Sequence, residues 1–203
     1  EAEQAVEAIH ALQSLRSGAV RIATSDAFAN ELVPRVCTEF QQHYPGVRFE
    51  VMVRATPQVS REVLMGDAEI GLCFSLAPSK DIRVVHRQSA PVVAVLPPGH
   101  PLARKRKISL AELTRYPLAL PPAETAVRQV IDMAGARQEL ALDPVLVSNH
   151  AKTLLKYVQY SGGVSVSSEV SVRHLVERGE LIVKPLSDAG MDLRDIEVQT
   201  LAD

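Results

Sequence analysis

The chain has 203 residues, of which 46% are hydrophobic, enough to bury one large α/β core or two small ones. Aromatic residues make up 4% and tryptophan is absent, so the core must consist mainly of Val, Leu, Ile and Ala, which suits parallel strands buried on both faces. The formal net charge of −2 argues against a nucleic-acid-binding domain, because such domains usually carry a net basic face.

The sequence lacks the common motifs for catalysis, metal binding and membrane insertion. It contains no P-loop, no G-x-G-x-x-G and no G-x-S-x-G string. The six histidines have no paired spacing for a metal, and Cys37 and Cys73 are expected to be buried free thiols. No stretch approaches the length of a membrane span, and nothing resembles a signal peptide. We therefore expect a cytoplasmic protein that is not an enzyme and has no cofactor, metal or membrane partner.

Residues 1–17 predict a helix, because they are polar, alanine-rich and free of Gly and Pro. Its apolar stripe is narrow, formed by Ala2, Ala5, Ile9 and Leu12, and Gly18 ends it. So short a helix is marginal alone, and we expect it to pack on a partner. The chain begins without Met inside this helix, so we expect a fragment whose N-terminal part is missing.

Strands and helices alternate over residues 20–74. Strands are predicted at 20–24, 47–54 and 69–74. The first helix between them is predicted by apolar residues at helical spacing, Phe28, Leu32, Val36 and Phe40. The second starts at Thr56 as cap with Pro57 after it, and stops at Gly66. This order implies parallel strands with right-handed crossovers.

A second α/β unit follows a proline-broken turn at residues 96–103. Strands are predicted at 82–85, 92–96, 116–120, 145–148, 164–167, 181–183 and 196–201. Helices are predicted at 109–113, 124–134, 150–160 and 169–178, with a capping box of Ser109 and Glu112 in the first and Asn149 as cap of the third. Two small α/β units joined by crossing strands typically bind a small molecule between them.

A recurring pattern suggests where such a molecule would bind: a strand ends at a hydroxyl or amide residue that opens a helix. The pattern occurs at four places, which supply the candidate site residues Thr24, Ser25, Asp26, Thr56, Glu124, Thr125, Asn149 and His150. In open parallel sheets ligands lie at the carboxyl ends of strands, and helix N-termini there suit anions. Any one such residue is more often a simple cap, but four helix starts divided between two units favour a shared cleft.

The whole pattern resembles the effector-binding domain of LysR-type transcriptional regulators, over essentially the full chain. The resemblance is carried by the order and spacing of GAVRIA at 18–23, LVP at 32–34, the segment 40–47, LMGDAEIGL at 64–72, LPPGHPLA at 96–103, ISLAEL at 108–113 and LVERGEL at 175–181. It implies a two-lobed, type 2 periplasmic-binding-protein-like fold in which each lobe is a mostly parallel sheet flanked by helices. Residues 1–18 would be the end of a linker helix, 19–90 with 189–203 lobe I, and 91–188 lobe II.

The resemblance also implies a function: a ligand-sensing and dimerisation domain that binds a small-molecule effector between its lobes. DNA would be bound through an N-terminal winged helix-turn-helix that is not in this chain. The expected partner is a second copy, with helix 30–43 of one subunit facing helix 124–134 of the other, and a tetramer in the full-length protein. The matches to the family's effector contacts are Ser25, Thr56, Thr125 and the helix start at Asn149 and His150.

Asp26 departs from what an anionic effector requires. Its carboxylate stands next to Ser25 and would repel an anionic ligand unless Arg54, Arg128 or His150 offsets the charge. Two other interpretations stay open. A solute-binding protein of a transport system would share the fold, carry an export signal and usually be monomeric. An enzyme resembling the porphobilinogen-polymerising deaminases would need a reactive cysteine for its dipyrromethane cofactor.

Overall fold

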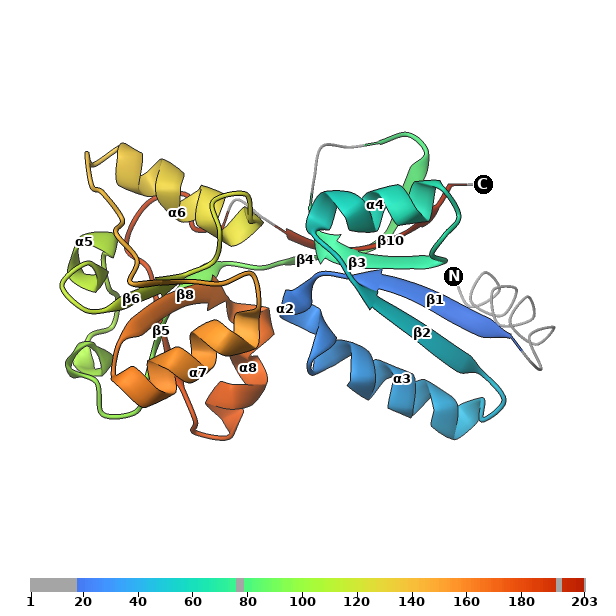
Figure 1. The fold of residues 1–203 in the computed structure, drawn as a ribbon, viewed down its shortest axis with the longest axis horizontal. Helices are drawn as coiled ribbons and strands as arrows, with labels where there is room; N and C mark the ends of the chain where they lie inside the picture. Colours follow the sequence, from blue (N-terminus) through green and yellow to red (C-terminus); the bar gives the residue numbers. More distant parts are fainter. Residues whose placement is uncertain (1–17, 76–78, 193–194, 203) are drawn as a thin grey trace.

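A computed structural model of the chain describes residues 18–75, 79–192 and 195–202. These residues form two lobes, each built on a five-stranded sheet with helices on both faces (Figure 1). The helix expected at residues 1–17 lies outside the described residues.

The sheet of lobe I has the strand order β2-β1-β3-β10-β4. Its strands are β1 (Ala19–Thr24), β2 (Arg48–Val53), β3 (Ile70–Phe74), β4 (Ile82–Ser89) and β10 (Asp195–Leu201). β1 pairs in parallel with β2 and β3, whereas β10 lies antiparallel between β3 and β4. All strands of this sheet except β10 therefore run in the same direction.

The sheet of lobe II repeats this arrangement with the order β7-β6-β8-β5-β9. Its strands are β5 (Val92–Leu96), β6 (Leu118–Leu120), β7 (Leu146–Val147), β8 (Val164–Ser168) and β9 (Ile182–Pro185). β6 pairs in parallel with β7 and β8, and β5 lies antiparallel between β8 and β9. The prediction of mostly parallel sheets flanked by helices is confirmed in both lobes.

The reversed strand of each sheet is the one that enters from the other lobe. β4 of lobe I leads through residues 90–91 into β5 of lobe II, and residues 186–192 lead from β9 back toward β10. We call these two stretches the crossing segments.

Helices cover both sheets. Lobe I carries α2 (Asp26–Ala29), α3 (Leu32–His43) and α4 (Thr56–Leu64). Lobe II carries the 3-10 helix η1 (Pro101–Arg104), α5 (Leu110–Leu113), α6 (Ala126–Ala136), α7 (Ala151–Ser161) and α8 (Glu169–Glu177). The predicted capping box of α5 is present, with Ser109 N donating to Glu112 Oε2 at 3.0 Å. Among the described residues, no helix is long and apolar enough to cross a bilayer.

The helix predicted from Phe28, Leu32, Val36 and Phe40 is wrong in one respect: it is broken into α2 and α3 at Asn30 and Glu31. The cause is Pro34, whose ring would clash with the carbonyl of Asn30 in a continuous helix. At the third position of α3 the proline is tolerated, because amides in the first turn have no partner within the helix. The break turns Phe28 into the core of lobe I, where its side chain is 1% exposed.

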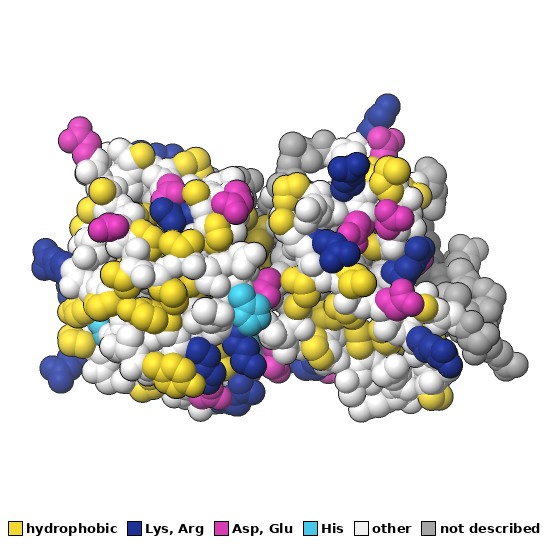
Figure 2. Space-filling model, viewed as in Figure 1, with side chains coloured by type: hydrophobic (Ala, Val, Ile, Leu, Met, Phe, Trp, Pro, Cys, Tyr) yellow, Lys and Arg dark blue, Asp and Glu magenta, His cyan; other side chains and the backbone are white. Residues whose placement is uncertain are grey.

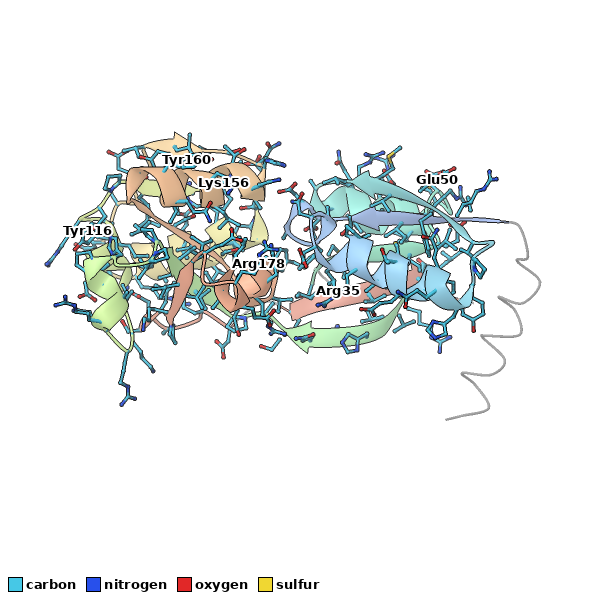
Figure 3. The ribbon with its side chains drawn as sticks, turned by 90° about the horizontal axis from the view of Figure 1, so that it is seen from below. Arg35, Glu50, Tyr116, Lys156, Tyr160 and Arg178 are labelled. Carbon is cyan, nitrogen blue, oxygen red and sulfur yellow. The ribbon has the colours of Figure 1, made fainter. Side chains whose placement is uncertain are left out.

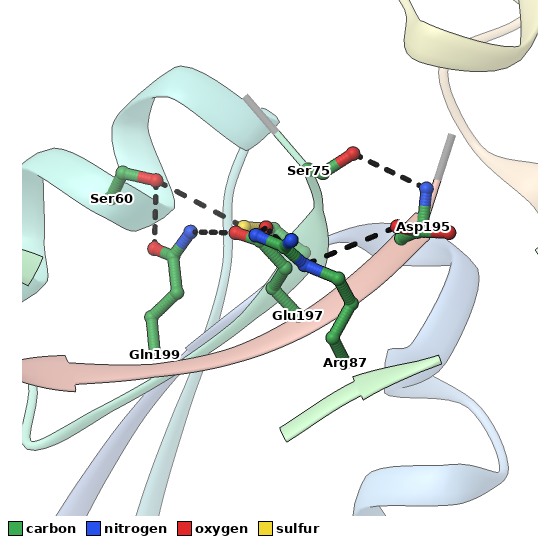
Figure 4. Close-up of polar contacts among 7 residues, drawn as sticks. Ser60, Ser75, Arg87, Asp195, Glu197 and Gln199 are labelled. Carbon is green, nitrogen blue, oxygen red and sulfur yellow. Dashed lines mark hydrogen bonds and ion pairs between the residues drawn. The ribbon is translucent and has the colours of Figure 1, made fainter. Parts of the chain in front are cut away.

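Lobe I also buries a polar network that ties its crossing strands together (Figure 4). Glu197 on β10 is 3% exposed and accepts hydrogen bonds from Arg87 Nη2 at 2.6 Å and from Gln199 Nε2 at 3.0 Å. Ser60 on α4 donates to Gln199 Oε1 at 2.8 Å. The network links β4, β10 and α4, so the strands that lead toward lobe II are held to the rest of lobe I.

Both cysteines are free thiols, as predicted. Cys73 on β3 is buried, and burial raises the pKa of its thiol to about 11. Cys37 on α3 is only partly buried, because its helix face is half exposed, so the prediction of burial is wrong for this residue.

Candidate functional site

Ser25 and Thr56 meet on lobe I where two neighbouring parallel strands end. Ser25 follows β1 and is the N-cap of α2, and Thr56 is the first residue of α4 after β2. Their hydroxyl oxygens lie 3.2 Å apart. Ser25 makes no side-chain cap to α2, and a hydroxyl can donate once and accept twice. The pair therefore keeps hydrogen-bonding capacity for a ligand atom.

Two details of lobe I differ from the prediction. Thr24 is 0% exposed and its hydroxyl donates to the Ser25 carbonyl oxygen at 3.3 Å, so this side chain points into the lobe. Thr56 is not the cap of α4, because Ala55 has the extended N-cap backbone and Gln58 Oε1 accepts from Ala55 N at 3.4 Å. The Thr56 hydroxyl therefore does not cap α4 and lies within hydrogen-bonding distance of the Ser25 hydroxyl.

Thr125 caps α6 on lobe II, as predicted. Its Oγ1 accepts from Arg128 N at 3.4 Å and donates to the Pro122 carbonyl oxygen at 2.8 Å. Glu124 before it is exposed. The hydroxyl of Thr125 thus already has local partners and keeps one acceptor position.

The start of α7 differs from the prediction. His150, not Asn149, is the N-cap, with extended φ and ψ of −104° and 108°. Its side chain makes no cap bond to the helix, because Nδ1 lies 3.0 Å from Thr153 Oγ1 instead. Asn149 is exposed. The first amides of α7 thus receive no cap from the side chain of His150.

Asp26 of lobe I supplies the missing acceptor. Its Oδ2 accepts a hydrogen bond from Ala151 N, the first residue of α7, and its Oδ1 lies 3.8 Å from His150 Nε2. The partial positive charge at the start of α7 therefore offsets the Asp26 charge. The other two cations considered are engaged elsewhere, Arg54 with Glu62 at 2.5 Å and Arg128 with Asp132 at 2.8 Å.

Further contacts join the lobes beside Asp26. Glu31 Oε2 lies 3.9 Å from His174 Nε2 on α8. Phe28 belongs to the core cluster of lobe I, against which Val127 of α6 and Val170 of α8 also pack. Figure 2 shows the seam between the lobes, where acidic and histidine side chains meet. These contacts were missed from the sequence, because no local spacing relates residues so far apart along the chain.

Two cavities lie in the described part of the chain, and none of the candidate residues lines them. One of about 310 Å³ lies between the α2–α3 junction, α7 and α8 and includes Glu31, Lys152, Lys156, His174 and Arg178. Figure 3 shows Lys156 on α7 and Arg178 at the end of α8. The other, of about 500 Å³, adjoins the crossing segments and includes Pro91, Lys107, Glu169, Pro185 and Asp188. Neither is lined by Ser25, Thr56 or Thr125, so the predicted residues do not open onto either of these cavities.

The described residues of the seam do not form a metal site. Within residues 18–75, 79–192 and 195–202, no group of three or more His, Cys, Asp or Glu side chains is placed to hold a metal ion. The seam instead offers hydroxyls, helix starts and the carboxylates of Asp26 and Glu31, groups with which proteins hydrogen-bond small polar molecules.

Known proteins resemble this chain along most of its length. The transcriptional activator CmpR of Synechocystis sp. is 27% identical over 173 residues, which make up 84% of this chain and 56% of that protein. The chain spans about half the length of the curated relatives it matches. Among solved structures, the effector-binding domain of QuiR in complex with shikimate superposes with a TM-score of 0.71 at 17% identity, covering 92% of this chain and 88% of that one.

The regulatory domain of CcmR from Synechocystis PCC6803, solved in complex with 2-PG, gives a TM-score of 0.72 at 20% identity and covers 92% of this chain and 88% of that one. These likenesses confirm the predicted two-lobed, periplasmic-binding-protein-like fold. A family model described as the LysR substrate binding domain matches residues 13–203. The chain therefore belongs to the LysR substrate binding domain family, which is a family of regulator domains and not of enzymes.

Proposed function

We propose that the chain is the ligand-sensing domain of a LysR-type transcriptional regulator and that it binds a small metabolite between its lobes. The observation that carries the proposal is the hydroxyl pair Ser25–Thr56, set where two parallel strands end and next to the seam with lobe II. The matched family favours this function over a solute-binding protein of a transport system.

A ligand would act by shifting the populations of lobe arrangements. Each lobe has a buried hydrophobic cluster of its own, and the lobes are connected through the two crossing segments, which suits a hinge. A ligand that binds one arrangement better than another shifts the equilibrium by that difference in affinity. In the full-length regulator, the shift would change how an N-terminal DNA-binding domain meets DNA in the cytoplasm.

The polar groups at the seam indicate which chemical groups the effector carries. Shikimate and 2-PG are the ligands of QuiR and CcmR, so small polar or anionic molecules are the first class to test. In this chain Asp26 already holds the start of α7. An acidic group of the ligand would therefore accept hydrogen bonds from the hydroxyls of Ser25 and Thr56. A hydroxyl or amine of the ligand would donate to the Asp26 carboxylate.

The test is a thermal-shift screen of small hydroxylated and anionic metabolites, beginning with shikimate and 2-PG, followed by calorimetry on each compound that stabilises the protein. Ser25→Ala and Thr56→Val should each weaken binding about tenfold, the usual effect of losing a hydrogen bond to a charged group. Thr114→Ala is the matched control, because its exposed hydroxyl bonds only within α5 of lobe II, to the Ala111 carbonyl oxygen at 2.9 Å. Binding that is equally strong in all three variants would contradict the proposed cleft.

The proposed assembly is an antiparallel homodimer, and a tetramer in the full-length regulator. The two helices expected to meet, α3 and α6, each expose an apolar side chain, Val36 at 52% and Met133 at 43%. Covering such side chains is favourable. We expect Val36→Asp to shift sedimentation from dimer toward monomer without loss of helix content. Sedimentation of the unmodified chain as a monomer at high concentration would contradict the dimer.

A further inference from the structure

Asp26 makes a contact that helix-start residues rarely make, since it caps a helix in the opposite lobe. It is the first residue of α2 in lobe I, and its carboxylate accepts from the first amide of α7 in lobe II, 125 positions later. The first amides of any helix lack partners within it and carry partial positive charge. A carboxylate is the acceptor that binds them most strongly, and the Asp26 side chain is only 21% exposed.

The contacts between the lobes converge on one short segment. Residues 26–31, which we call the latch segment, contribute Asp26 to α7, Phe28 to the cluster joined by Val127 and Val170, and Glu31 to His174 on α8. The Pro34 break sets the direction of the segment, and the buried side chain of Phe28 anchors it within lobe I. It thus presents two carboxylates to lobe II from one position.

We propose that Asp26 is an interlobe latch: its carboxylate closes the two lobes on each other without any effector, and an effector must open this contact to enter the cleft. The charge on Asp26 is the strongest element of the latch, and the Glu31–His174 pair supports it. The inference rests on the proposed function in one respect, namely that a ligand enters between the lobes.

The latch can be opened from either side. Asp26→Ala removes the carboxylate, and Asp26→Asn keeps an acceptor while removing its charge. Ala151→Pro removes only the amide hydrogen that Asp26 accepts. Proline is well tolerated at the first position of a helix, and His150 before it already has an extended backbone, so α7 should stay intact.

Two controls match these variants. Ala151→Ser changes the same residue but keeps the amide hydrogen. Glu112→Ala removes a carboxylate that also accepts from a helix start, Ser109 N at 3.0 Å, but entirely inside lobe II. Neither control should alter the contact between the lobes.

The measurement is hydrogen exchange by mass spectrometry on the unliganded chain, read on peptides covering residues 26–32 and 168–176. We expect amide exchange in these peptides to be at least about tenfold faster in Asp26→Ala and Ala151→Pro than in the wild type, which is the effect of losing a charge-assisted hydrogen bond. The exchange rate of Asp26→Asn should lie between those of these two variants and that of the wild type. The two controls should exchange in these peptides like the wild type. The double variant Asp26→Ala/Ala151→Pro should exchange no faster than Asp26→Ala alone, because Asp26→Ala already removes the bond that Ala151→Pro breaks.

Wild-type exchange rates in Asp26→Ala or in Ala151→Pro would overturn the latch, as would additive effects in the double variant. The outcome is separable from that of the proposed function. If the latch variants behave like the wild type while Ser25→Ala still loses ligand, the latch is wrong and the cleft stands. If the latch variants open but Ser25→Ala binds every ligand normally, the cleft is wrong and the latch stands.

Discussion

His100 is a buried titratable side chain whose role is structural. It is 6% exposed and caps η1, with Nδ1 accepting from Leu102 N at 3.2 Å. Its ring lies 4.5 Å from that of Tyr116, and Nε2 has no hydrogen-bond partner. Burial lowers the pKa of His100, so folding favours the neutral form of the ring.

His100 should make the stability of the fold depend on pH. Because its pKa is lower in the folded than in the unfolded chain, its contribution is complete above the unfolded value of about 6.5 and is lost as pH falls through the folded value. His100→Asn keeps an acceptor for Leu102 N but does not titrate. Urea unfolding at pH 7.5 and 5.5 should therefore show a smaller loss of stability on acidification in the variant. An equal loss in both proteins would show that His100 does not titrate on unfolding.

At the scale of elements, the position of α4 depends on a glycine of β3. A Cβ on Gly71 would lie 2.8 Å from Val63 Cγ2 and 3.1 Å from Val59 Cγ1, both on α4. The absence of a side chain lets the helix lie close on the sheet. Since α4 begins with Thr56, this packing also sets the distance between Thr56 and Ser25.

Gly71→Ala should push α4 away from the sheet and lower the free energy of unfolding by about 1–3 kcal/mol, the usual effect of overpacking a core. Val63→Ala makes room for the added methyl group. The double variant should accordingly be more stable than the sum of the two single losses implies, as measured by urea unfolding. Strict additivity would mean that the two side chains do not meet.

The elements themselves were largely predictable, because apolar periodicity and capping residues act locally. The strands β1 to β3, the Ser109–Glu112 capping box and the Thr125 cap were all predicted. The break between α2 and α3 was missed, although Pro34 is a local signal for it. The cap of α4 was predicted one residue too late, at Thr56, and the cap of α7 one residue too early, at Asn149. Both residue types are good caps on propensity alone.

In the whole molecule, the chain passes between two similar lobes along the crossing segments, and the lobes meet along one seam (Figure 1). The candidate residues Ser25 and Thr56 lie side by side, because both follow adjacent parallel strands. The sequence showed that Asp26 needed a compensating positive charge and offered Arg54, Arg128 and His150 for it, but it did not identify the hydrogen-bond donor. That partner is the start of α7, and a contact across so long a stretch of chain depends on how the lobes sit together.

A ligand site between the lobes can be located by amide chemical-shift mapping of the 22.1 kDa chain, titrated with a metabolite that stabilises it in the thermal-shift screen. The largest shifts should fall on both lobes at once, at residues 24–28 and 55–58 of lobe I and 124–128 and 149–152 of lobe II. Shifts confined to one lobe, or centred on residues 185–192 beside the crossing segment, would contradict a ligand held between Ser25, Thr56 and the helix starts of lobe II.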